Sequence, residues 1–248
     1  MSIRYVLAIA AALALAACDK TRDADAHTRT VSSKDPEART AKSGTSGASV
    51  DVKGDTLLQR ADQGRIMGNP AANVWMIIVS DFQCPYCRQF HEQNAAILRK
   101  EYVQTGKVRM AYINLPLSMH PHAWPAAERA MCSAAQGKFW PVHDAMFASQ
   151  ARWEGLDSAG VRVFFDSLAV AAGADKEQLR ACVDSRRVRA LIQADYDRSA
   201  QSGVQSTPTV IIGNAQLPGV QPIGNYRQAL DAALKDANAR LPVKKNGA

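Results

Sequence analysis

The sequence predicts an α/β domain whose sheet is interrupted by a long block of helices, and three features of the 248-residue chain indicate it. Residues 74–79 form a continuous apolar run, which is typical of a strand buried on both faces. A Cys-Pro-Tyr-Cys sequence at 84–87 then opens a helical pattern. Residues 120–202 carry helical periodicity without strand signals, and a strand pattern returns at 207–214.

The N-terminus predicts export and lipidation. Residues 1–17 read as a signal peptide, because Arg4 precedes an apolar stretch too short to span a bilayer as a mature helix. Leu-Ala-Ala stands directly before Cys18, which resembles the lipobox of bacterial lipoproteins and predicts a lipid on Cys18. Ordinary signal cleavage, with Cys18 incidental, is the alternative. Asp19 resembles the enterobacterial signal for retention in the inner membrane.

A tether is expected to follow the lipid. Residues 18–60 are polar, rich in Thr, Ser, Ala and Gly, and lack apolar periodicity, so we expect disorder. The 30 Lys and Arg residues exceed the 23 Asp and Glu residues, giving a net charge of +7. This surplus is compatible with an anionic membrane surface nearby, and no motif supports nucleic-acid binding.

The remaining elements follow from hydrophobic periodicity and turn residues. Residues 65–70 are expected to lead into the first strand, and residues 108–113 to form a second. We expect helices at 123–135, 139–147, 160–171, 176–184 and 188–200, then a strand at 207–214, a partner strand at 216–219 and a last helix around 226–234. The sheet domain therefore comprises residues 61–119 and 203–240, with the helical block 120–202 between them and a flexible tail at 241–248.

The cysteines at 84 and 87 have the spacing of a redox pair. Cysteines three apart in the first turn of a helix lie on one face, within reach of a disulfide. The helix N-terminus stabilises negative charge on Cys84, which predicts the attacking thiolate, while Cys87 lies deeper and resolves the mixed disulfide. Pro85 suits the first helical position. A zinc site including His91 is the alternative, although no second Cys or His pair follows nearby.

Three segments together resemble the DsbA-like branch of the thioredoxin superfamily. They are Asp-Phe-Gln-Cys-Pro-Tyr-Cys at 81–87, Gln-Gly-Lys-Phe-Trp at 136–140 and Gly-Val-Gln-Ser-Thr-Pro-Thr at 203–209. The resemblance covers residues 65–236 and implies a thioredoxin fold with an inserted α-helical subdomain. It also implies that Pro208 is cis and faces the cysteines. The backbone of Thr207 would then lie beside Cys84, where an extended substrate strand can pair.

Two positions depart from the family pattern. Ile78 stands where family members usually carry a buried acid that exchanges protons with the second cysteine. Another group or water would have to move that proton, or the cycle would be slower. The dipeptide between the cysteines is Pro85-Tyr86, without a histidine to stabilise the Cys84 thiolate. We therefore expect a milder oxidant than the strongest family members.

Cys132 and Cys182 are left over in the helical block. Some DsbA-like proteins have a second disulfide between helices, and this placement is similar to theirs. In an exported chain such cysteines usually bridge. Two buried free thiols are the alternative.

The resemblance implies an envelope thiol:disulfide oxidoreductase, lipid-anchored on the periplasmic side of the inner membrane. It needs no cofactor or metal and acts on the thiols of exported proteins. A membrane partner of the DsbB or vitamin-K-epoxide-reductase-like kind would reoxidise it. We expect a monomer, because the tether is too polar to be the dimerisation module of envelope isomerases. A reductase or isomerase kept reduced is one alternative, and a non-catalytic peptide- or copper-binding module is another.

Overall fold

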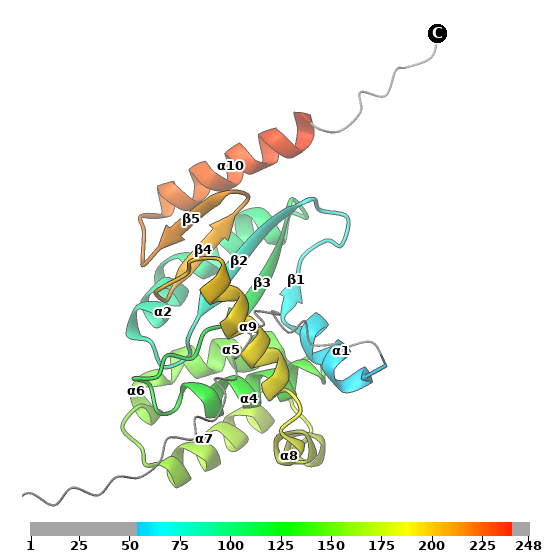
Figure 1. Ribbon diagram of the computed structural model, residues 1–248, viewed down its shortest axis with the longest axis vertical. Coiled ribbons are helices and arrows are strands. Elements are labelled where there is room, and N and C mark those ends of the chain that lie inside the picture. The colour runs from blue at the N-terminus through cyan, green and yellow to red at the C-terminus, as the bar shows by residue number, and fades with distance from the viewer. Residues whose placement is uncertain (1–53, 240–248) are drawn as a thin grey trace, which may run out of the picture. The chain divides into compact units, whose positions relative to one another are not determined.

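The computed structural model describes residues 54–239. The predictions for the signal peptide, Cys18, the tether up to residue 53 and the tail at 241–248 lie outside these residues. Within them the sheet has the strand order β1-β3-β2-β4-β5, and Figure 1 shows helices around it. The strands are β1 (Ile66–Met67), β2 (Val74–Ser80), β3 (Val108–Asn114), β4 (Thr209–Ile212) and β5 (Ala215–Pro218). Only β2 and β3 pair in parallel, and the predicted thioredoxin-type α/β fold is confirmed.

One face of the sheet is covered by two helical segments. The first begins with α2 (Pro85–Phe90) and continues through α3 (Ala96–Leu98) and two π-helical stretches, His91–Ala95 and Arg99–Val103. The second is α10 (Ile223–Ala239), which lies along β4 and β5 in Figure 1. Their apolar side chains form one core with the inward-facing residues of the three central strands. The β2 strand therefore delivers the Cys-Pro-Tyr-Cys turn directly above a packed core.

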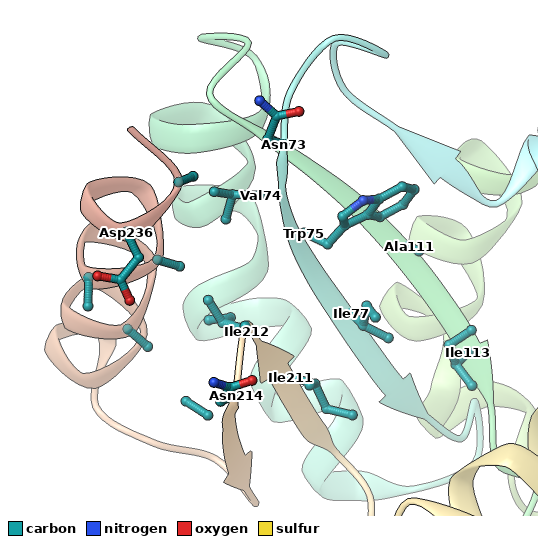
Figure 2. A pocket seen from close by; sticks show the side chains of 16 residues that line it. Asn73, Val74, Trp75, Ile77, Ala111, Ile113, Ile211, Ile212, Asn214 and Asp236 are labelled. Atoms are coloured by element: carbon teal, nitrogen blue, oxygen red, sulfur yellow. The ribbon is translucent and has the colours of Figure 1, made fainter. Parts of the chain in front are cut away.

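The other face is only partly covered, so the expectation that β2 is buried on both faces is wrong at its first residues. Trp75 and Ile77 are half-buried, whereas their neighbours Met76 and Ile78 are buried. Figure 2 shows Trp75 and Ile77 beside a cavity of about 710 Å³ at the start of β2. The cysteines follow the opposite end of this strand, so the cavity is separate from them.

The helical block forms a second core. It contains α4 (Ala123–Ala134), α5 (Phe139–Ala148), α6 (Gln150–Trp153), α7 (Ser158–Ala171), α8 (Lys176–Ser185) and α9 (Arg189–Gln201). The five predicted helices are present with ends within two residues, and the short α6 is additional. Trp153 packs edge-on against Phe165, with ring centroids 4.8 Å apart. A disulfide between Cys132 and Cys182 joins α4 to α8.

The predicted tether extends too far toward the domain. Thr56–Gly64 forms the helix α1, so residues 56–60 are helical and the expectation of disorder there is wrong. The Asp55 side chain accepts hydrogen bonds from the first-turn backbone N–H groups and caps the helix. Leu58 and Ala61 are buried against the helical block. Gly64 permits the approach, because a Cβ there would lie 2.2 Å from the carbonyl oxygen of Ala134.

A buried ion pair joins the sheet to the helical block. Arg65, which precedes β1, donates to the carboxylate of Asp195 on α9, and also to the carbonyl oxygen of Tyr112 on β3 at 3.3 Å. The same carboxylate accepts the backbone and side-chain N–H groups of Asn114, each at 3.0 Å. Asp195 is fully buried, so its charge depends on these donors.

Arg65→Met should lower the free energy of unfolding by about 3 kcal/mol, because the buried Asp195 carboxylate then keeps only the more exposed Arg198 as a counter-charge. Urea unfolding measures the loss. Arg180→Met is the matched control, since Arg180 and Asp184 form an exposed pair on α8. That control should cost less than about 1 kcal/mol. Equal stability of the two variants would contradict the structural role of the buried pair.

Candidate active site

The two cysteines of residues 54–239 that form no disulfide stand at the N-terminus of α2. Cys84 is the N-cap residue, and Pro85 occupies the first helical turn, as the sequence predicts. The backbone N–H of Cys84 donates to the carbonyl of Asp81 at 3.1 Å, which closes the turn after β2. Cys84 is 4 % exposed and Cys87 is 1 % exposed, so a partner reaches the pair through Cys84.

The Cys84 sulfur is placed to be a thiolate. A hydrogen bond from the Cys87 thiol lowers the pKa of Cys84 to about 6, helped by Thr207 and by the backbone N–H groups of Cys87 and Tyr86 and opposed by burial. The stabilising groups are those of a helix N-terminus together with the second cysteine. Cys84 can therefore attack, and leave, as a thiolate near neutral pH.

Cys87 has the opposite electrostatic environment. Burial raises its pKa well above the ordinary value, and the neighbouring Cys84 raises it further. The backbone N–H of Asp81 donates to its sulfur at 3.4 Å. Ile78, which stands at the position of the family's acid, is buried and lines a small cavity together with Cys87. No carboxylate at position 78 can exchange a proton with this thiol.

The loop before β4 completes the site. The peptide bond between Thr207 and Pro208 is cis, and the Cys84 thiol donates to the carbonyl oxygen of Thr207 at 3.4 Å. The structure thus brings the two distant predicted segments together. Tyr86 is 63 % exposed, so an apolar ring stands at the surface beside the reactive sulfur. An extended chain laid along this loop would have a backbone to pair with.

Two polar residues outside the redox pair, Gln150 and Asp81, shape the site. Gln150, fully buried on α6, donates its side-chain amide to the carbonyls of Phe82 and Cys84, at 2.8 and 3.1 Å. The Asp81 carboxylate accepts from the backbone N–H groups of Gln83 and Leu117, so both of its oxygens are engaged in hydrogen bonds. No sequence motif signals these contacts, which arise only when the helical block packs on the turn.

A histidine does stand near the thiolate, although not between the cysteines. His120 lies 2.7 Å from the Asp81 carboxylate through its Nδ1 atom. This hydrogen bond raises the pKa of His120, with a smaller contribution from the negative charge of Cys84. The Asp81 carboxylate therefore favours the protonated form of His120, in the loop after β3. The sequence conceals this role because His120 is 36 residues from Cys84.

The zinc alternative finds little support in the geometry. Among residues 54–239 the cysteines belong to no cluster of histidines and carboxylates that could surround a cation. His91 instead lies near Asp144, whose carboxylate oxygens accept from the Arg99 guanidinium at 2.9 and 3.1 Å. Because this guanidinium already neutralises the carboxylate, we assign no metal ligands there.

Comparisons with known proteins place the chain among thioredoxin-like proteins. The family model described as thioredoxin matches residues 60–232. The Na(+)/H(+) antiporter NhaA 3 of Salinispora tropica is 31% identical over 187 residues, 75% of this chain and 26% of that protein. The chain thus spans about a quarter of that antiporter's length. The probable disulfide bond formation protein D of Bacillus anthracis is 26% identical over 189 residues, 74% of this chain and 83% of that protein.

The fold is similar to that of solved structures. The match to the crystal structure of alpha-DsbA1 from Wolbachia pipientis has a TM-score of 0.63 and 18% sequence identity. It covers 72% of this chain and 94% of the Wolbachia chain. In residues 54–239 no helix combines the length and the apolar character needed to cross a bilayer.

The pH dependence of alkylation should follow the Cys84 thiolate, with a midpoint near its pKa of about 6. Cys87→Ala removes the largest stabilising hydrogen bond and should move the midpoint up, toward the ordinary value of 9.0. Cys87→Ser keeps an O–H donor and should move it less. A midpoint that is unchanged in Cys87→Ala would show that Cys87 does not stabilise the thiolate.

The same shift affects the stability of the reduced protein. The pKa of Cys84 is lower in the folded protein than in the unfolded chain. Between about pH 6 and 9, Cys84 is therefore a thiolate in the folded reduced protein and a protonated thiol in the unfolded reduced chain. The stabilisation is complete above pH 9 and is lost as pH falls through 6. Urea unfolding of the reduced protein should therefore show stability rising over this window, and Cys84→Ser should flatten the rise.

Proposed function

The chain belongs to the DsbA-like family of thiol:disulfide oxidoreductases in the thioredoxin superfamily, and on this premise we propose that it exchanges disulfides with exported proteins through Cys84 and Cys87. The carrying observation is the asymmetry of the pair: one thiol ionises near neutral pH and the other is buried and protonated. Such an asymmetry assigns attack and departure to Cys84 and resolution to Cys87.

The exchange proceeds in two sulfur displacements. With the Cys84–Cys87 disulfide formed, a substrate thiolate attacks the Cys84 sulfur and Cys87 leaves, taking up a proton. A second substrate thiolate then attacks the substrate sulfur of the mixed disulfide. The substrate disulfide forms, Cys84 leaves as a thiolate, and the protein holds both electrons as a reduced pair. Each displacement forms one S–S bond and breaks another.

The direction we propose is disulfide donation. A low pKa makes Cys84 a good leaving group and stabilises the reduced protein, which favours passing the disulfide on. Thr207 presents a backbone carbonyl beside Cys84, which suits an extended and unfolded substrate segment. A reductase or isomerase would need the pair held reduced instead.

The cellular setting is proposed from the N-terminal sequence. Residues 1–17 and Cys18 support export and lipidation, which would hold the domain on the periplasmic side of the inner membrane. A membrane redox partner of the DsbB or vitamin-K-epoxide-reductase-like kind would then remove the two electrons from the reduced pair. We propose that the protein acts as a monomer.

Cysteine variants test the assignment of roles. Cys84→Ser should abolish oxidation of a reduced dithiol peptide, since Cys84 is the sulfur that a partner can reach. Cys87→Ser should accumulate mixed disulfides through Cys84, visible on non-reducing gels. The matched control is the double variant, which should trap nothing. Complexes that form with Cys84→Ser and not with Cys87→Ser would reverse the roles.

The reduction potential tests the direction of exchange. At equilibrium with glutathione we expect the Cys84–Cys87 pair to be mostly reduced, because a disulfide donor passes its disulfide on readily and is itself stable in the reduced form. A potential near that of thioredoxin, about −270 mV, would instead support the reductase alternative.

Cys18→Ala tests the anchor. Loss of the lipid should move the protein from the membrane pellet to the periplasmic fraction, because a protein held by its acyl chains loses its attachment with them. Cys132 and Cys182 remain unchanged in this variant, so the fold should be retained. Unchanged membrane association would place the attachment elsewhere in the chain.

A further inference from the structure

The buried Cys87 thiol needs a route for its proton. Cys87 is 1 % exposed, yet it must be a thiolate when it attacks and must regain a proton after it leaves. The residue beneath it, Ile78, cannot carry that proton. A group positioned to carry that proton would speed the reaction of the buried sulfur.

A small cavity lies next to this sulfur. Its volume is about 10 Å³, which is close to the minimum of about 10–15 Å³ that one water molecule needs. Cys87, Ser80 and His91 line it, so the walls carry polar atoms that can hold a water molecule. Cys87 and His91 are four residues apart on one helical segment, and the backbone N–H of His91 donates to the carbonyl of Cys87.

His91 also lines a second cavity, which opens to the surface. That pocket has a volume of about 360 Å³ and includes Arg99 and Asp144. The imidazole is therefore part of the wall between the cavity at Cys87 and solvent. Its Nδ1 atom is buried without a hydrogen-bond partner in the structure. This atom lies 3.9 Å from a carboxylate oxygen of Asp144, which lines the surface pocket, so a proton on the ring can leave toward that pocket.

Burial is the main reason that the neutral form of His91 is favoured. Burial lowers the pKa of His91, and Arg99 lowers it further, against Asp144 and Glu92, which raise it. His143 packs edge-on against it, with ring centroids 5.3 Å apart. A neutral imidazole near pH 7 can accept a proton and release it to the surface pocket.

The other titratable groups near Cys87 are less suited. Burial raises the pKa of Tyr112 well above its ordinary value, so the phenol does not give up its proton. Burial lowers the pKa of His143 to about 4, and this ring lines the inner cavity without lining the surface pocket. Asp81 is engaged by Leu117 and His120.

We propose that His91 relays the proton of Cys87 between the inner cavity and solvent, through one water molecule, in place of the carboxylate that Ile78 replaces. When Cys87 resolves a mixed disulfide, its S–H proton passes to the water, and the water gives a proton to His91. The Cys87–Cys84 bond forms as the bond from Cys84 to the substrate sulfur breaks. His91 then releases its proton to the surface pocket. The reverse sequence protonates Cys87 when it leaves. This proposal rests on the proposed function.

Two-phase kinetics with the aromatic disulfide dithiobis-nitrobenzoate separate the two sulfurs. Reduced protein should release one coloured thiolate when Cys84 attacks the reagent, and a second when Cys87 resolves the mixed disulfide. His91→Ala should leave the first phase unchanged and slow the second at least about tenfold at neutral pH, within the range of general acid–base catalysis. The second phase should also become steeper with pH, because hydroxide then has to remove the proton.

Chemical rescue and two further variants make the test specific. Free imidazole should restore the second phase of His91→Ala, because truncation opens the surface pocket toward the inner cavity. His91→Gln keeps hydrogen bonding without titrating, and should be slow. Arg180→Met changes an exposed residue on α8 and should behave as wild type in both phases. Thermal melting confirms that each variant is folded.

The outcomes distinguish the proton relay from the disulfide exchange on which the relay depends. An unchanged second phase in His91→Ala and His91→Gln, or equal slowing of both phases, would overturn the relay while leaving the redox pair intact. Slowing of the second phase without rescue by imidazole would assign His91 a packing role and also overturn the relay. Absence of a second phase in wild-type protein would overturn both the proposed exchange and the relay.

Discussion

A buried carboxylate, Asp195, holds the sheet and the helical block in one arrangement. Arg65 reaches it from the strand side, and Asn114 donates to it from the end of β3. Removing such a charge from water is costly, so the surrounding donors have little freedom to move without losing its compensation. The relative placement of the two cores follows from this constraint, because α9, which carries Asp195, is the last helix before the chain returns to the sheet.

The active site lies across that junction. Cys84 comes from the end of β2, Thr207 comes from the segment that follows α9, and Gln150 comes from the middle of the helical block. The thiolate environment therefore exists only when both cores are assembled. This explains how a short loop with few contacts of its own can hold a carbonyl 3.4 Å from a reactive sulfur.

The sequence predicts the parts of the site whose chemistry is local. The redox pair is recognisable from the spacing of its cysteines, from the proline at the helix start and from the Thr207-Pro208 segment, which are all short stretches of sequence. The long helices are recognisable from their hydrophobic periodicity. The roles of Gln150 and His120 depend on tertiary contacts between residues of ordinary type, so no sequence pattern indicates them. The helix α1 could not be predicted for a related reason. Its two buried residues, Leu58 and Ala61, are buried only when α4 is present, and most of its other residues are polar. The open face of β2 could not be foreseen, because an apolar run does not reveal whether anything covers it.

The disulfide between Cys132 and Cys182 lies inside the helical block, where the two residues are fully buried or nearly so. A protein-sized oxidant cannot reach those sulfurs after α4 and α8 have packed, so an oxidant of that size has to act while the chain is still folding. The packing that protects the finished bond from reduction by other proteins therefore also sets the order in which the bond and the helical block form.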